Sequence, residues 1–212
     1  MRIVKFGHAC VRLEHDGQVV VLDPGAFTDR EAVEGATAVL ITHEHPDHLD
    51  VDHLRATGAA VYTTEAVRTL VAGVDPGVAD RVQVVTPGQS FDAGLPVTAV
   101  GELHAVIHPE LPRVANSGFL VDVGGTRVYH PGDSLTPPGG PVDLLLLPVH
   151  APWSKFSEVL DFARQVGAPR SVAVHDGLLN AAGLGVLERN FAILLADDQD
   201  YRRVEPGTDL LG

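Results

Sequence analysis

Residues 38–48 have the sequence AVLITHEHPDH, and this stretch decides the fold. Its first five residues are apolar or β-branched, which is typical of a short core strand. The next six contain three histidines and an aspartate, although turns are usually built from Asp, Asn, Ser and Gly. Asp50 can then cap a helix over residues 51–57. The stretch predicts metal ligands on a loop at the carboxyl end of a strand, where open α/β sheets carry their chemistry.

The spacing of these side chains predicts two metal positions. In an extended loop, residues i and i+2 project to the same side, so His43 and His45 can reach one metal together. Pro46 stiffens the turn, and the chain can then direct Asp47 and His48 at a second point. Two imidazoles at one position, and a carboxylate with an imidazole at the other, suit Zn²⁺, Mn²⁺ or iron at a two-metal site.

Length and composition predict a single domain over residues 1–212 and limit its partners. The formal net charge of −13 leaves no basic stripe for phosphate contacts, so we expect no nucleic-acid partner. No apolar run is long enough to span a bilayer and no signal peptide follows Met1, so we expect no membrane association and a cytoplasmic location. Cys10, the single cysteine, excludes an intrachain disulfide and is expected to be a buried structural thiol. Whether the protein forms a homo-oligomer is left open.

Short strands dominate both halves of the chain, and helices follow them in each half. Turns at 16–17 and 124–125 join strands as hairpins. We expect strands at 3–6, 10–14, 19–22, 38–42, 60–63, 82–85, 96–105, 118–123, 127–130, 142–149, 171–174 and 201–204, and further helices at 65–72, 157–165 and 184–195. This order predicts two packed sheets with helices outside, in two similar halves.

Three further side chains of ligand type follow later strands: His104, Asp133 and His175. Each lies where a predicted strand ends, so the three can complete the two metal positions together with the hexapeptide of residues 43–48. His108 competes with His104 as the third histidine ligand. We favour His104 because it lies nearer the strand end, and this leaves His108 beside the ligands or facing a substrate.

Together these motifs resemble the metallo-β-lactamase superfamily: His-x-His-x-Asp-His at 43–48, a later histidine, Gly-Asp at 132–133 and a final histidine. The resemblance covers about residues 3–210 and implies an α/β fold, the four-layer αββα sandwich. It implies that two sets of three residues hold the metals and that a seventh bridges them. The first set is His43, His45 and His104, the second is Asp47, His48 and His175, and the bridge is Asp133.

The context of His104 separates the chain from two branches of that superfamily. Thiol-ester hydrolases and true lactamases carry this histidine in Gly-His-x-x-Gly, whereas here the sequence is Gly-Glu-Leu-His-Ala at 101–105. The chain is instead similar to the branch of predicted metal-dependent hydrolases that includes ascorbate-6-phosphate lactonase and phospholipase-D-like enzymes. The matching motifs are Gly-His-Ala at 7–9, Leu-Asp-Pro at 22–24, Asn-Ser-Gly at 116–118 and Tyr-His-Pro-Gly-Asp at 129–133.

Four more polar side chains lie near the predicted ligands. Asp23 ends an apolar strand and can either orient a ligand imidazole through its ring N–H or form a turn. His8 is either a pocket-lining residue, as the resemblance implies, or a hydrogen-bonded structural histidine. His130 and His150 each end a strand and are expected to support ligands.

Other side chains are expected to lie away from the metals. His15, beside a hairpin turn, and His53, inside a helix, are expected to be solvent-exposed. Arg113, Trp153 and Lys155 lie on loops between strands, where they either face a substrate or lie on the surface.

The expected function is hydrolysis at a centre of two divalent cations, Zn²⁺ or Mn²⁺, with iron also admissible. Two close cations make a bridging hydroxide available near neutral pH, and one polarises the oxygen under attack. Asp47 and Asp133 are the expected catalytic carboxylates, and the expected substrate is a small-molecule ester, lactone or phosphodiester. Two alternatives stay open: a di-iron redox protein, and a metal-binding domain without catalysis.

Overall fold

The computed structural model describes residues 1–211, and their strands form two mixed sheets. The first has the order β1-β2-β3-β4-β5-β6, and the second has the order β13-β12-β11-β10-β9-β8-β7. The first sheet contains β1 (Arg2–Lys5), β2 (Val11–His15), β3 (Gln18–Leu22), β4 (Ala38–Leu40), β5 (Ala60–Thr63) and β6 (Val82–Val84). The second contains β7 (Ser90–Asp92), β8 (Pro96–Val100), β9 (Gly118–Val123), β10 (Thr126–His130), β11 (Leu144–Pro148), β12 (Arg170–Val174) and β13 (Asp200–Arg202).

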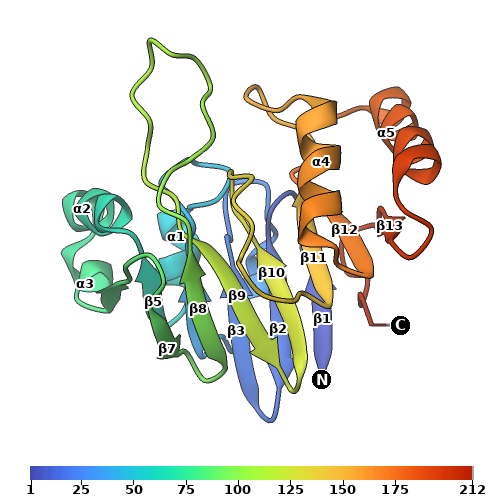
Figure 1. The fold of residues 1–212 in the computed structure, drawn as a ribbon. Helices are drawn as coiled ribbons and strands as arrows, with labels where there is room; N and C mark the ends of the chain where they lie inside the picture. Colours follow the sequence, from blue (N-terminus) through green and yellow to red (C-terminus); the bar gives the residue numbers. More distant parts are fainter. Residues whose placement is uncertain (212) are drawn as a thin grey trace.

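Helices cover the outer face of each sheet, so the predicted four-layer αββα sandwich is confirmed (Figure 1). The helices α1 (Val51–Arg55), α2 (Glu65–Val74) and α3 (Pro76–Ala79) follow strands of the first sheet, and α4 (Phe156–Val166) and α5 (Ala181–Leu194) follow strands of the second. A short 3-10 helix, η1 (Arg30–Val33), packs on the first sheet as well.

The strand β11 shows why the sheets lie in the middle of the molecule. All five of its residues are buried. Leu144 and Leu146 belong to the core between the two sheets, whereas Leu145 and Leu147 belong to the core beneath α4 and α5. A strand covered on both faces needs an unbroken apolar run, and this is the run that the sequence shows.

The topology brings the ends of several strands to one edge. Strands β3 to β6 are parallel to one another, and so are β10 to β13. Parallel strands end at the same edge of a sheet, so loops that follow β3, β4, β10 and β12 meet there. Six of the seven predicted ligands lie on the last three of these loops, and the seventh, His104, lies on the loop after β8.

The expected elements are found, with a few differences. The strand expected at 96–105 ends at Val100, because Gly101 has a φ of +75° and turns the chain out of the sheet. Residues 101–117 then form a loop that rises above the body of the molecule (Figure 1). The short strand β7, helix α3 and helix η1 are not among the expected elements.

The sequence predicts that His15 and His53 are exposed and that Cys10 is buried, and the structure can be compared with both predictions. His53 is buried and its Nδ1 lies 3.0 Å from the carbonyl oxygen of Pro24, so the expectation that it is exposed is wrong. The short helix α1 turns this residue toward the loop after β3. His15 is partly exposed. Cys10 is fully buried, and burial raises the pKa of its thiol, which confirms a structural role. Within residues 1–211, no helix has the length and apolar character to cross a bilayer.

Candidate metal centre

The first group of ligand atoms comes from both sheets. The loop after β4 supplies His43 and His45, and the second sheet supplies His104 and Asp133. Ligand atoms of these four residues all lie within 4.8 Å of one another. The Nε2 atom of His43 lies 3.0 Å from Nδ1 of His45, and Nε2 of His104 lies 3.3 Å from Oδ2 of Asp133.

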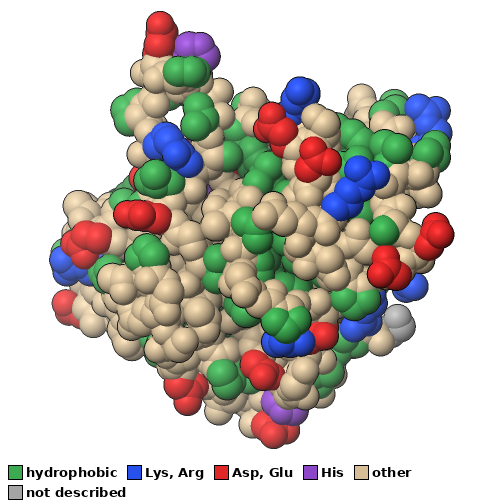
Figure 2. All heavy atoms as spheres, viewed as in Figure 1, with side chains coloured by type: hydrophobic (Ala, Val, Ile, Leu, Met, Phe, Trp, Pro, Cys, Tyr) green, Lys and Arg blue, Asp and Glu red, His purple; other side chains and the backbone are tan. Residues whose placement is uncertain are grey.

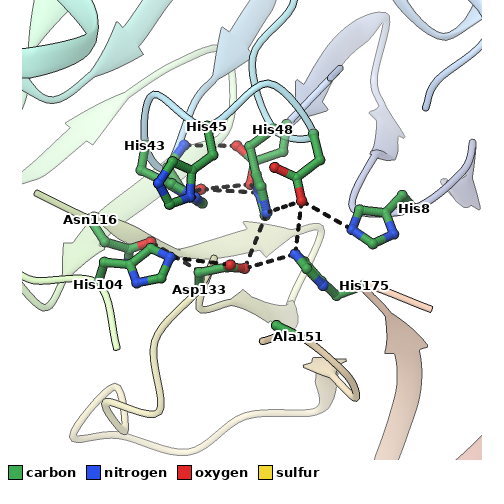
Figure 3. A network of polar contacts seen from close by, with 12 residues as sticks. His8, His43, His45, His48, His104, Asn116, Asp133, Ala151 and His175 are labelled. Atoms are coloured by element: carbon green, nitrogen blue, oxygen red, sulfur yellow. Dashed lines mark hydrogen bonds and ion pairs between the residues drawn. The ribbon is translucent and has the colours of Figure 1, made fainter. Parts of the chain in front are cut away.

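A second group lies on the other side of Asp133 (Figure 3). The Nε2 atoms of His48 and His175 lie 3.1 and 3.2 Å from Oδ1 of Asp133. Oδ2 of Asp47 lies 3.2 Å from the same nitrogen of His175 and 4.0 Å from that of His48. The structure therefore brings all seven predicted ligands together, with Asp133 between the two groups.

The hexapeptide loop is held against the loop after β3. His48 and Leu49 both donate their backbone N–H groups to the carbonyl of His45, which forms the turn. Gly25 allows the close approach of the two loops, because a Cβ atom there would lie 2.0 Å from the carbonyl oxygen of Asp47. Ala26 donates its backbone N–H to the carbonyl of Pro46 at 2.8 Å. The direction of the ligands thus depends on a glycine far from them in sequence.

Asp23, at the end of β3, orients the histidines of this loop. One carboxylate oxygen accepts hydrogen bonds from the backbone N–H of Thr42, and the other accepts from the Thr42 hydroxyl, each at 2.7 Å. The second oxygen also lies 2.7 Å from Nδ1 of His48 and 2.8 Å from Nε2 of His130. Because Thr42 gives its hydroxyl hydrogen to Asp23, its oxygen accepts from Nδ1 of His43, 2.9 Å away. Of the two roles expected for Asp23, the structure shows the orienting one.

Two further histidines in the ligand groups, His104 and His175, are oriented by backbone carbonyls. Nδ1 of His104 lies 2.6 Å from the carbonyl oxygen of Ala105, and Nδ1 of His175 lies 2.5 Å from that of His150. An oxygen acceptor requires a hydrogen on the facing nitrogen. In the neutral ring the lone pair is then on Nε2, which is the atom that points into the group. The same holds for His43 and His48.

The chemistry of these atoms fits divalent metal ions. Nε2 of His48, His104 and His175 and Oδ1 of Asp133 are buried, yet none has a hydrogen-bond partner within residues 1–211. Buried polar atoms rarely lack partners, because leaving them unpaired costs about 1–3 kcal/mol each. Imidazole nitrogens and carboxylate oxygens directed at a common point are ligands of Zn²⁺, Mn²⁺ and iron. The residues present therefore fit two such ions.

The carboxylates and the imidazoles of the site shift one another's pKa. Burial alone would raise the pKa of Asp133, but His48 and the other two histidines hold it well below its usual range. Burial likewise disfavours the charged form of His175, but Asp133 and Asp47 outweigh it and raise its pKa to about 9. For His48, the same competition between burial and the carboxylates of Asp133 and Asp23 raises the pKa well above its ordinary value. Without metal, these two histidines therefore hold protons at neutral pH.

Two contacts to Asp133 were outside the sequence prediction. Trp153 is buried and donates its indole N–H to Oδ2 of Asp133 at 2.7 Å, so it is not a surface residue. Asn116 accepts a hydrogen bond from the backbone N–H of Asp133 at 3.1 Å. Its side-chain amide also donates to the carbonyl of Pro131. Trp153 and Asn116 are 20 and 17 positions from Asp133 in the sequence. Only knowledge of how the loops run in space would have revealed these two contacts.

The remaining candidates lie around the centre rather than in it. His108 is exposed on the loop of residues 101–117, away from the group that contains His104. Arg113 donates its guanidinium to the carbonyl of His104 and so braces that loop. His130 and His150 contact Asp23 and His175 respectively, as supporting residues. Lys155 precedes α4 as its N-cap residue and is exposed.

The αββα sandwich with histidine and aspartate groups at strand ends defines a class of metal-dependent proteins. Residues 2–175 match the family model described as the beta-lactamase superfamily domain. The protein Rv0786c of Mycobacterium tuberculosis is 37% identical over 196 residues, which cover 88% of this chain and 89% of that protein. A UPF0173 metal-dependent hydrolase of Methylobacterium nodulans is 33% identical over 152 residues, 63% of each chain. The chain belongs to the metallo-β-lactamase superfamily.

A solved structure shows the same fold. Igni18, a metallo hydrolase from the archaeon Ignicoccus hospitalis, superposes with a TM-score of 0.75 at 19% sequence identity. The match covers 99% of this chain and 97% of that one. The two sheets and their helices are therefore arranged as in a complete known protein of this fold.

Proposed function

We propose that this metal-dependent hydrolase of the metallo-β-lactamase superfamily holds two divalent cations and cleaves a small-molecule ester, lactone or phosphodiester. The observation that carries the proposal is the convergence of buried, unpartnered Nε2 atoms on the two oxygens of one aspartate, Asp133. The Nδ1 atoms of these three histidines already face oxygens, so each ring directs its other nitrogen at this point. Two cations would satisfy them all.

The geometry suggests how the ligands are shared. His43, His45 and His104 would hold one cation, and Asp47, His48 and His175 would hold the other. Asp133 would contact both, since its Oδ2 faces His104 while its Oδ1 faces His48 and His175. We propose Zn²⁺ or Mn²⁺, because mixed imidazole and carboxylate sets suit both, and iron would fit the same set.

The residues around the centre would support hydrolysis without a serine or cysteine nucleophile. When bound, a pair of divalent cations lowers the pKa of water and polarises the carbonyl or phosphoryl oxygen under attack. Asp133 is ionised at neutral pH, because its neighbours lower its pKa, and its Oδ1 has no hydrogen-bond donor. That oxygen can accept a proton during the reaction. Trp153 holds the other oxygen and keeps the carboxylate in one orientation.

The entrance to the centre supports a substrate with an apolar part. A pocket of about 180 Å³ is lined by His45 and His104 together with side chains of the loop of residues 101–117, namely Ile107, Leu111, Pro112, Arg113 and Val114. Figure 2 shows hydrophobic side chains along this projecting loop, where Leu103, Val106, Ile107 and Leu111 are exposed. Such a pocket favours a group that is apolar over most of its surface.

Metal analysis with a substrate panel tests the proposal. After removal of metal by a chelator and reconstitution with Mn²⁺, Zn²⁺ or Fe²⁺, the protein is expected to bind two equivalents. Activity is then assayed on lactones, aryl esters and bis-aryl phosphates. Asp133→Ala is expected to lower activity by about 10³-fold, since the carboxylate contributes several kcal/mol through the metals, and His45→Ala is expected to lose the first cation.

The matched control is Asp161→Ala, which removes an exposed aspartate of α4. It should retain metal and activity. If the wild-type protein binds no transition metal, the proposal fails, and a single equivalent contradicts the two-metal centre. Iron bands in the visible spectrum with oxygen reduction instead of hydrolysis would favour a redox protein, and two bound metals with no turnover of any substrate would favour a metal-binding domain.

A further inference from the structure

His8 lies beside the second group of ligands and its role is decided by its hydrogen bonds. The residue follows β1, and its side chain is buried. Its Nε2 lies 3.3 Å from Oδ2 of Asp47, and its ring centroid lies 4.0 Å from that of His175 (Figure 3). By distance alone, His8 groups with Asp47 and His175 as a third potential ligand.

The tautomer of His8 argues against metal binding. The backbone N–H of Gly177 donates to Nδ1 of His8 at 3.0 Å. An N–H group can only donate, so Nδ1 carries no hydrogen and the neutral ring carries it on Nε2. This is the reverse of His43, His48, His104 and His175, whose Nδ1 atoms face oxygens. A ring nitrogen that carries hydrogen has no lone pair for a metal.

The surroundings of His8 keep the ring in this orientation. A Cβ atom at residue 177 would lie 3.0 Å from Nδ1, so the close contact with the backbone depends on glycine there. Phe27 packs edge-on against the other side of the ring, with centroids 5.3 Å apart.

The backbone of His8 also contacts the second group. Its carbonyl accepts a hydrogen bond of 2.7 Å from the backbone N–H of His175. His175 has a φ of +59°, a left-handed conformation that costs a non-glycine residue about 1–2 kcal/mol. Such a conformation persists only where its surroundings hold it. One residue therefore contacts both Asp47 and His175, from its ring and from its backbone.

We propose that His8 is a positioning residue for the second cation, in which Nε2–H donates to Asp47 and the carbonyl holds His175, and that it is not itself a metal ligand. The proposal rests on the proposed two-metal function for the cation that it serves. Nε2 of His8 is buried with no other hydrogen-bond partner within residues 1–211, so its hydrogen is available to the carboxylate. Partners of this kind in metalloproteins typically change metal affinity by about 10–100-fold.

Metal titration of two variants tests the role of the ring. His8→Phe keeps a planar ring but removes both nitrogens, whereas the amide of His8→Gln can accept from Gly177 and donate to Asp47. We expect His8→Phe to weaken the second equivalent of Mn²⁺ or Zn²⁺ by about 10–100-fold and to leave the first unchanged. His8→Gln is expected to bind both equivalents nearly as the wild type does. His15→Phe, at the far end of β2, is the control and should have no effect.

Two results of the titration would overturn the proposal. Wild-type affinity for both equivalents in His8→Phe would show that the ring does not position Asp47. Loss of the second equivalent in His8→Gln as complete as in His8→Phe would indicate a ligand instead. If His8→Phe does not fold, the comparison of His8→Gln with the wild type still decides between donor and ligand.

A second measurement tests the tautomer without any metal. Long-range ¹H–¹⁵N correlation spectra distinguish the two neutral tautomers of histidine. The spectra of the wild-type protein, recorded before and after addition of Zn²⁺, are expected to show His8 protonated at Nε2 in both states. Protonation at Nδ1 in either state contradicts the proposal. A wild-type protein that binds fewer than two cations refutes the two-metal function, yet the tautomer of His8 is still measured.

Discussion

Two buried aspartates lie at strand ends in the two different sheets, and their hydrogen bonding is not alike. Asp23, after β3, is fully buried and accepts from two groups of Thr42 and from two histidines. Asp133, after β10, has one indole donor on Oδ2, while Oδ1 has no hydrogen-bond partner within residues 1–211. Both carboxyl groups have a lowered pKa, so both are ionised.

The difference separates an orienting carboxylate from the one that we propose to coordinate metal. Asp23 has no oxygen left for a metal, and its donors are themselves ligand histidines or residues that hold them. Asp133 instead faces the Nε2 atoms of three imidazoles with its two oxygens, at 3.1–3.3 Å. In metal sites, carboxylates like Asp23, whose oxygens accept from several donors, direct the ring nitrogens of histidine ligands. His48 presents Nδ1 to Asp23 and Nε2 to Asp133, so the nitrogen that faces each aspartate indicates its role better than burial or ionisation does.

The largest effect is expected from removing the charge of Asp23. In Asp23→Asn the amide group would place N–H hydrogens against the donors of His48, His130 or Thr42, since only one acceptor oxygen remains. Breaking a buried charged network typically costs about 3–5 kcal/mol. We therefore expect a loss of this order in the free energy of unfolding, measured by urea denaturation of the metal-free protein, and a weaker second cation in metal titrations.

Asp16→Asn is a matched control for this substitution. Asp16 and Asp23 both have left-handed backbones, with φ values of +48° and +42°. Asparagine tolerates that conformation, so strain cancels between the two variants. Asp16 is exposed in a hairpin turn, and its variant should change stability by no more than about 0.5 kcal/mol. Equal effects in both variants would contradict the orienting role of Asp23.

A second effect is expected of pH on metal affinity, because protons occupy the metal-facing nitrogens of His48 and His175. The pKa of His175 is raised to about 9 and that of His48 is raised as well, so both rings are protonated at pH 7 when no metal is bound. A cation must displace those protons, so metal affinity should rise with pH up to about 9, by about tenfold per pH unit for each proton released.

Calorimetry checks the released protons directly. Titrations at pH 7 in buffers of different ionisation enthalpy should give different apparent enthalpies of metal binding, in proportion to the protons released. Affinity that is constant between pH 6 and 9, with no dependence on the buffer, would show that His48 and His175 are already unprotonated.

Much of the fold and the gathering of the candidate ligands at one place could be predicted because both depend on local patterns. The hexapeptide follows a β-branched strand, and His104, Asp133 and His175 each follow a strand or its extension, so the rule of parallel strand ends places them at one edge. The branch that includes ascorbate-6-phosphate lactonase stays a prediction. The strand at 96–105 was predicted too long, because alternation continues past Gly101 although its backbone turns there.

Beyond Asp23, His130 and His150, the supporting contacts could not be predicted, because they depend on how distant loops pass one another. Trp153 reaches Asp133 from the loop before α4, and Gly177 reaches His8 across 169 positions. His53 was placed on the surface from its short helix, yet it contacts the loop after β3. Composition and periodicity say nothing about such pairs.

The smallest effect is expected from Trp153, whose indole N–H donates to Oδ2 of Asp133. Trp153→Phe removes the indole N–H and keeps much of the ring, so one donor is lost while the cations still hold the carboxylate. We expect a loss of about tenfold in metal affinity, at the low end of the effects of such partners, measured by calorimetry. Phe156→Leu, which changes a nearby aromatic residue without a contact to the ligands, should leave the affinity unchanged.

Trp153 is also the single tryptophan of the chain, so its fluorescence reports on Asp133 in the wild-type protein. Binding of Mn²⁺, which is paramagnetic, is expected to quench this emission, and Zn²⁺ is expected to shift it without comparable quenching. In Asp133→Ala the Mn²⁺ response should disappear at concentrations that saturate the wild type. A response that survives in Asp133→Ala would place the cation away from this carboxylate, and the two aspartates would then differ in hydrogen bonding but not in coordination.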